Sequence, residues 1–213
     1  MLGAMSFVTN FGDAAMVIPA SAVLIIILRL FAGRREAAAF AVAFGSCLLA
    51  IALAKLVCAT CDFRSPIFGI RNPSGHAALA AVFYGSIGQL LAAGQRTALR
   101  LAVYAGAAAM IGLVAASRVA LHAHGVPEVV FGVLTGAAAI GVSGLWRRTS
   151  RFQLSFGPRT GALCVLAASA AFASSLVHWS ADPVIDAAAA EIRAEVKICQ
   201  SSQPALRAPA DRR

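Results

Sequence analysis

The chain has 213 residues, of which 60% are apolar and 13% charged, whereas an ordinary soluble domain is about 45–50% apolar and about 25% charged. This composition excludes a soluble globular enzyme, a disordered chain and a disulfide-stapled secreted module, and it favours a membrane protein. The net charge of +9 would suggest nucleic acid in a soluble protein. Here the basic residues lie between apolar blocks, so no nucleic-acid partner is expected.

Six uncharged apolar blocks predict transmembrane helices, because only a helix satisfies its own backbone hydrogen bonds at that depth in a bilayer. No basic residue precedes the first block, and no short apolar core with a cleavage site is present, so a cleaved signal peptide is not expected. The fold class is therefore an all-α, polytopic membrane helical bundle. Its helices are expected near residues 14–32, 37–57, 76–94, 99–116, 127–145 and 160–178.

The connections between the blocks differ in charge. One set carries nine arginines and a single acid, Glu36, and this set should face the cytoplasm by the positive-inside rule. Both termini are then expected outside, in a bacterial-type inner (plasma) membrane. The nine basic residues are Arg29, Arg34, Arg35, Arg96, Arg100, Arg147, Arg148, Arg151 and Arg159.

The last part of the chain, residues 181–213, is expected to be separate from the transmembrane domain of residues 1–180. Asp182-Pro183 is a helix-start signal, because an N-cap residue precedes a proline. Apolar residues then recur every four positions from Val184 to Val196, which predicts a short amphipathic helix on the membrane surface. The polar residues from Gln200 onward are expected to be disordered.

Ionisable residues within membrane helices usually serve a function, and here they gather at the ends of blocks on the predicted outer face. Their types suit phosphate esters, which require fixed positive charge and backbone donors. Two histidines on separate helices offer a nucleophile and an acid. The residues are Lys55, Arg64, Arg71, Pro73-Ser74-Gly75-His76, Ser117-Arg118, His124 and Glu128.

The sequence resembles the type 2 phosphatidic acid phosphatases, which share a site with the vanadium haloperoxidases. That family's second motif is present intact as Pro73-Ser74-Gly75-His76. Its third motif is present as Ser117-Arg118, five residues, His124, three residues and a carboxylate. The resemblance covers residues 50–135 by motif and the outer helices by topology alone.

Two positions depart from the family pattern. Glu128 stands where the family usually has Asp, which keeps a carboxylate with one more methylene. In the first motif, Asp62 rather than an arginine follows Lys55 at the usual distance. Arg64 is favoured for the missing arginine, and Arg71 is the alternative.

The resemblance implies a metal-independent phosphoric ester or diphosphate hydrolase that acts on lipids without a cofactor. His124 would attack phosphorus and form a phosphohistidine, His76 would protonate the leaving oxygen, and Glu128 would orient His124. The phosphate-binding residues implied are Lys55, Arg64 (or Arg71), Ser74, Gly75 and Arg118.

Several residues also have plainer interpretations. Lys55 can snorkel to the membrane interface, and His122 does not fit the motif spacing and is taken as a loop residue. Cys58 and Cys61 are interpreted as small core residues rather than a zinc site, and a disulfide between them is left open.

Three functions remain open at this point. The first is a lipid phosphate or diphosphate phosphatase at the outer face. The second is a lipid-to-lipid phosphotransferase, for which the same residues would serve. The third is a non-catalytic membrane protein that keeps the fold. The particular lipid and the oligomeric state are not determined by the sequence.

Overall fold

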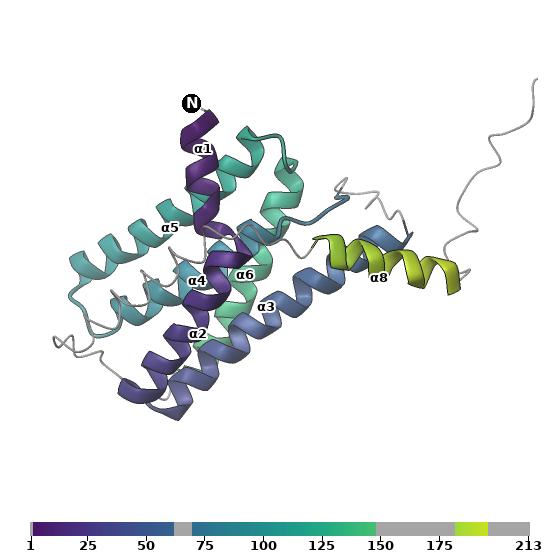
Figure 1. Ribbon diagram of the computed structural model, residues 1–213. Coiled ribbons are helices and arrows are strands. Elements are labelled where there is room, and N and C mark those ends of the chain that lie inside the picture. Colours follow the sequence, from purple (N-terminus) through teal and green to yellow (C-terminus); the bar gives the residue numbers. More distant parts are fainter. Residues whose placement is uncertain (1, 62–69, 148–181, 196–213) are drawn as a thin grey trace, which may run out of the picture.

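The computed structural model describes residues 2–61, 70–147 and 182–195 (Figure 1). Within these ranges the chain forms helices and no strand. The elements are α1 (Leu2–Thr9), the 3₁₀ helix η1 (Asn10–Gly12), α2 (Ala14–Phe31), α3 (Arg34–Cys61), α4 (Gly75–Ala92), α5 (Thr97–Ala120), α6 (Val126–Arg147) and α8 (Asp182–Glu195).

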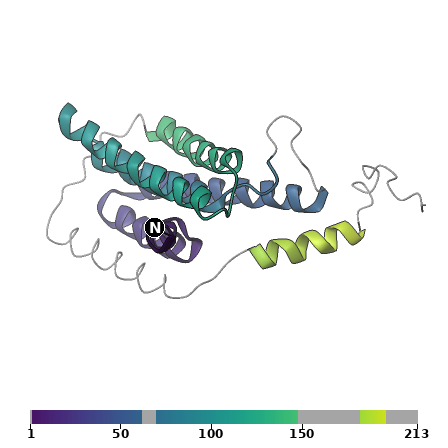
Figure 2. The same ribbon diagram turned by 90° about the horizontal axis from the view of Figure 1, so that it is seen from above.

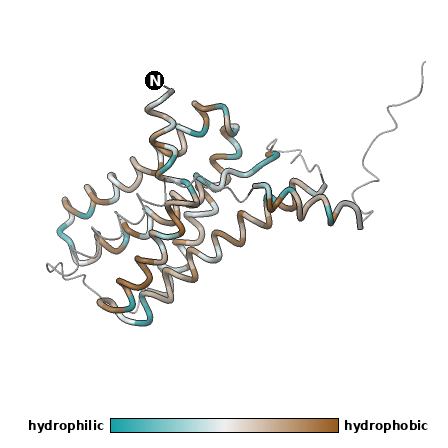
Figure 3. The backbone as a smooth tube through the Cα atoms, in the orientation of Figure 1, coloured by the Kyte–Doolittle hydropathy of each residue, from teal (hydrophilic) through white to brown (hydrophobic). Residues whose placement is uncertain are grey.

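Five described helical segments are long and apolar enough to cross a membrane: Gly3–Phe31, Arg34–Thr60, Gly75–Ala92, Thr97–Ala120 and Val126–Gly144. The predicted all-α, polytopic fold and the first five predicted helices are therefore confirmed. The sixth, near residues 160–178, lies outside the described residues. Hydrophilic residues gather at the helix ends and links, while apolar residues cover much of α2 and α3 (Figure 3).

Short links turn the chain back on itself between neighbouring helices. Gly33 follows α2 with φ of 98°, and Gly94 follows α4 with φ of 73°. Glycine adopts this left-handed conformation without a steric penalty, which ends one helix and starts the next within a few residues. The arginines next to the α2–α3 and α4–α5 links thus lie at one end of the bundle. The α3–α4 and α5–α6 connections lie at the other end.

Helix α4 is the most buried of the five membrane helices and packs mainly against α5 and α6. Glycines let α6 approach it closely. A Cβ on Gly136 would lie 2.6 Å from the carbonyl oxygen of Ala78 and 2.6 Å from the Cβ of Ala81. A Cβ on Gly132 would collide with the carbonyl oxygen of Ser74. Small residues at such interfaces let two backbones meet, which is how helices associate in lipid.

Helix α8 begins at Asp182, as predicted, and packs against α3. Figure 2 shows it beside the end of α3, outside the bundle. Ala189 of α8 is buried, whereas Val184 (65% exposed) and Ile192 (37%) of the predicted apolar stripe face outward. The stripe is therefore available to a membrane surface, and a neighbouring face contacts the protein. The disorder predicted from Gln200 onward lies outside the described residues.

The close approach of α6 to α4 predicts a contrast between two glycines of one helix. Gly136→Ala should destabilise the protein by about 1–3 kcal/mol, because an added methyl group has no room against α4. No described residue lies within 4 Å of a Cβ on Gly141, so Gly141→Ala should be neutral or stabilise by up to about 1 kcal/mol. Thermal unfolding in detergent measures both. Equal midpoints for the two variants would contradict the packing.

Candidate active site

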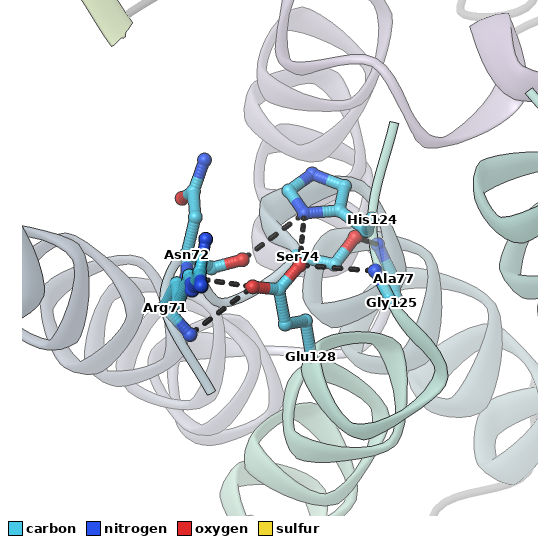
Figure 4. A network of polar contacts seen from close by, with 7 residues as sticks. All are labelled: Arg71, Asn72, Ser74, Ala77, His124, Gly125 and Glu128. Atoms are coloured by element: carbon cyan, nitrogen blue, oxygen red, sulfur yellow. Dashed lines mark hydrogen bonds and ion pairs between the residues drawn. The ribbon is translucent and has the colours of Figure 1, made fainter. Parts of the chain in front are cut away.

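The carboxylate of Glu128 connects three segments of the chain (Figure 4). Its Oε1 accepts hydrogen bonds from the backbone N–H groups of Arg71 (3.1 Å) and Asn72 (2.9 Å). Its Oε2 accepts from the N–H of Gly125 at 3.1 Å and lies 3.2 Å from Nδ1 of His124. Glu128 thus fixes the segment before α4 against the start of α6.

The position of Glu128 follows from the start of α6. Gly125 precedes the helix, Pro127 occupies its first turn, where no N–H partner is needed, and Glu128 is its third residue. A glutamate at this position reaches back to the N–H before the helix, as in a capping box. The Glu128 carbonyl also accepts from the Ser74 N–H at 3.1 Å, so α6 and α4 begin side by side.

The same contacts assign the tautomer of His124. Its Nδ1 lies 3.0 Å from the carbonyl oxygen of Asn72 and 3.2 Å from Oε2 of Glu128. Both neighbours can only accept a hydrogen bond, so Nδ1 carries the hydrogen. In the neutral ring Nε2 is then unprotonated and holds a lone pair. That lone pair is what a nucleophilic histidine requires.

Burial also keeps His124 neutral. The side chain is only 7% exposed, and this burial lowers its pKa. The hydrogen bond with Glu128 raises the pKa, whereas the positive charges of Arg118 and Lys55 lower it further, with a net shift downward. These charge effects place both cations in the neighbourhood of the ring.

The end of α5 explains the five-residue spacing between Arg118 and His124. The N–H of Ala123 donates to the carbonyl of Arg118 (3.1 Å), and the N–H of His122 donates to that of Val119 (3.0 Å). These two bonds form a Schellman motif, with His122 as its left-handed residue at φ of 53°. The turn reverses the chain after Arg118 and brings His124 back toward it. The loop role predicted for His122 fits this place.

Ser74 and Gly75 begin α4 beside Lys55. Ser74 is fully buried and is the N-cap residue, with its hydroxyl accepting from the N–H of Ala77 at 3.4 Å. A Cβ on Gly75 would lie 3.8 Å from Cε of Lys55. The Ser74 N–H is bonded to the Glu128 carbonyl, and the phosphate-binding role of Ser74 stays a prediction.

A cavity of about 280 Å³ lies next to these residues, between α3, the segment before α4 and α8. Lys55 and Arg71 give it positive charge, and α8 contributes Ile185 and Asp186. The structure therefore places Arg71, the alternative for the first motif, in the same cavity as Lys55. Arg64, which the sequence favoured, lies outside the described residues, so the choice between the two arginines is untested.

Two predicted site residues contact an N-terminal segment that the sequence did not single out. Nε2 of His76 lies 3.4 Å from Oδ2 of Asp13, and Nη1 of Arg118 donates to Oγ1 of Thr9 at 3.0 Å. The available signal was an acidic residue at the outer end of the first apolar block, since carboxylates are rare in membrane segments without a partner.

The remaining candidates are the two neighbouring cysteines and a metal site. Cys58 is a free thiol, and the side chain of Cys61 lies outside the described residues. Within the described ranges no three His, Cys, Asp or Glu side chains gather in a way that would hold a metal ion. Metal independence of the reaction stays a prediction.

Comparison with known proteins supports the same class of protein. Residues 55–152 match the model of the PAP2 superfamily, so the predicted resemblance to the type 2 phosphatidic acid phosphatases is confirmed over this stretch. The match supports a phosphatase, that is, a phosphoric ester hydrolase in the broad sense. The five apolar helices identify a membrane protein.

One curated relative is the "Uncharacterized 22.5 kDa protein in cps region" of Klebsiella pneumoniae. It is 33% identical over 137 residues, which cover 62% of this chain and 63% of the relative. The aligned part thus spans less than two thirds of that protein. No solved structure matches the chain.

The geometry predicts a sharp difference between two substitutions of Glu128. All four groups around its carboxylate are donors, so Glu128→Gln would turn an NH₂ group toward at least one of them. We expect a loss of up to about four orders of magnitude in turnover, as for an orienting carboxylate in a Ser-His-Asp triad. Glu128→Asp keeps a carboxylate and should cost far less.

The measurement is phosphatase turnover in detergent across a pH series. Glu128 raises the pKa of His124, so the residual activity of Glu128→Gln should persist to lower pH than that of the wild type, because neutral His124 is the active form. A wild-type rate for Glu128→Gln would remove Glu128 from the mechanism.

Proposed function

We propose that the protein is an integral-membrane lipid phosphate or lipid diphosphate phosphatase that works through a phosphohistidine on His124. The observation that carries the proposal is the contact of Nδ1 with two acceptors. It leaves Nε2 as a nucleophile within a cluster of positive charge. A non-catalytic membrane protein that only keeps the fold would not require a buried histidine to be held in this tautomer.

In the proposed reaction Nε2 of His124 attacks phosphorus, and the bond from phosphorus to the leaving oxygen breaks. His76 gives its proton to that oxygen. Water then attacks the phosphohistidine, returns a proton to His76 and releases phosphate. Neither step changes an oxidation state. The positive side chains neutralise the charge that spreads over the phosphoryl oxygens.

The phosphate-binding roles are proposed for Lys55, Arg118, Ser74 and Gly75, with Arg64 or Arg71 as the further cation. Lys55 and Arg71 share the cavity, and Lys55 lies beside the first residue of α4. The first N–H groups of a helix have no partner within it, and they favour anions. A phosphoryl group held there would meet both positive charge and backbone donors.

The proposed substrate is a membrane lipid because of where the cavity lies. It opens at the ends of helices that are long enough to span a bilayer. The outward-facing stripe of α8 would rest on the same membrane surface. An amphiphile can then present its head group to the site while its acyl or prenyl tail stays in the bilayer.

The proposed orientation places the site on the exterior or periplasmic side. The helix ends and links at the opposite end of the bundle carry Arg29, Arg34, Arg35, Arg96 and Arg100, and positively charged connections stay in the cytoplasm. Reporter fusions test this: a fusion after Gly94 should report the cytoplasm, and one after Gln200 the exterior. The reverse pattern would overturn the placement.

Purified protein in detergent should release phosphate from at least one lipid of a panel that includes phosphatidic acid, phosphatidylglycerol phosphate, undecaprenyl diphosphate and lipid A. Activity should persist in excess chelator, and vanadate should inhibit as a mimic of the transferring phosphoryl group. His124→Ala should abolish both turnover and acid-labile ³²P labelling of the protein.

Three outcomes would change this proposal. Activity lost in chelator and restored by magnesium or zinc would sink the mechanism, as would near-native activity of His124→Ala. Transfer of the label to a second lipid, in place of release as phosphate, would identify a phosphotransferase with the same site.

A further inference from the structure

The N-terminal segment touches the candidate site although it lies far from the motifs in sequence. Asp13 stands between η1 and α2 and uses its two carboxylate oxygens differently. Oδ1 accepts the N–H of Ala15 at 2.8 Å and so caps α2. Oδ2 lies 3.4 Å from Nε2 of His76. The matched family stretch begins only at residue 55, so it assigns nothing to this residue.

The residues next to Asp13 are closely packed, and this packing fixes its position. A Cβ on Gly12 would lie 2.6 Å from Cγ1 of Val114 and 2.9 Å from the carbonyl oxygen of His76. The hydroxyl of Tyr84 on α4 donates to the carbonyl of Phe11 at 2.9 Å. These contacts hold η1 against α4 and α5, and the cap then fixes the rotamer of the Asp13 side chain.

If His76 is a general acid, one ring nitrogen gives the proton to the leaving oxygen, and the other can be held by a neighbouring residue. We propose that Asp13 is a positioning residue for His76, holding Nε2–H so that Nδ1 carries the proton that goes to the leaving oxygen. After transfer the ring is neutral, with Nε2–H still donated to Asp13. The carboxylate keeps its negative charge throughout. This inference rests on the proposed function, in which His76 is the general acid.

Asp13→Asn is a sharp test because it separates the two tasks of the side chain. Asparagine is as good an N-cap as aspartate, and its amide oxygen can still accept from Ala15. Its NH₂ group then faces Nε2–H and cannot accept from it. The helix cap survives, and the hold on His76 is lost.

The test compares two leaving groups in purified protein. A short-chain phosphatidic acid releases an alcohol, which needs protonation, whereas p-nitrophenyl phosphate releases a stable phenolate. General acid catalysis contributes 10²- to 10⁴-fold, so Asp13→Asn should lower kcat on the lipid at least about 10-fold. It should lower kcat on the aryl phosphate less than about threefold, with KM little changed on both.

A double-mutant comparison makes the assignment specific to His76. In a His76→Ala background, Asp13→Asn should have no further effect on the lipid, because the residue that it positions is gone. Glu191→Gln, a loss of an exposed carboxylate on α8, is the matched control and should leave turnover unchanged. The thermal midpoints of Asp13→Asn and the wild type should agree.

Each other outcome is decisive. Equal losses on the two substrates, or the same additional loss in the His76→Ala background, would show a merely structural role and overturn the inference while the phosphatase proposal stands. Unchanged turnover of Asp13→Asn on the lipid would overturn it too. A wild-type protein that hydrolyses neither these two substrates nor any other lipid of the panel would overturn the proposed function and this inference with it.

Discussion

The candidate site depends on one carboxylate that lies among four donors. Glu128 accepts from Arg71, Asn72, Gly125 and His124. An acceptor-only group satisfies all four, and charge-assisted bonds are about twice as strong as neutral ones. Through these bonds the start of α6, the segment before α4 and the histidine share a single geometry.

The Glu128 carboxylate reaches its donors because of the way α4 and α6 pack together. Its reach across to residues 71–72 requires the starts of α4 and α6 to lie nearly backbone to backbone, and Gly132 and Gly136 provide that approach. The packing and the chemistry are therefore one constraint: a larger residue at Gly132 would push α6 away from Ser74 and pull the carboxylate from its donors. Interface glycines in such a bundle act on function through distance.

Much of this arrangement could be read from the sequence, because a membrane imposes a simple code. Uncharged blocks of near-spanning length gave five helices that the structure confirms, and the cap at Asp182 gave the start of α8. Motif spacing gathered Lys55, Ser74, Arg118 and His124 at one end of the bundle. The use of the Ser74 N–H by Glu128 could not be foreseen, because no local pattern records a hydrogen bond between residues 54 positions apart in sequence.

The role of the N-terminal segment could not be predicted from the sequence for the same reason. Thr9 and Asp13 lie more than 60 residues from the side chains that they contact, and no motif joins them. There is nevertheless a physical reason for the contacts of Thr9 and Asp13 with the site. His76 on α4 lies beside Asp13, and Arg118 on α5 donates to Thr9. In an apolar bundle a charged side chain is stable only beside water or a polar partner. The break between α1 and α2 brings a hydroxyl and a carboxylate to Arg118 and His76, which ties the first membrane helix to the chemistry of the third and fourth.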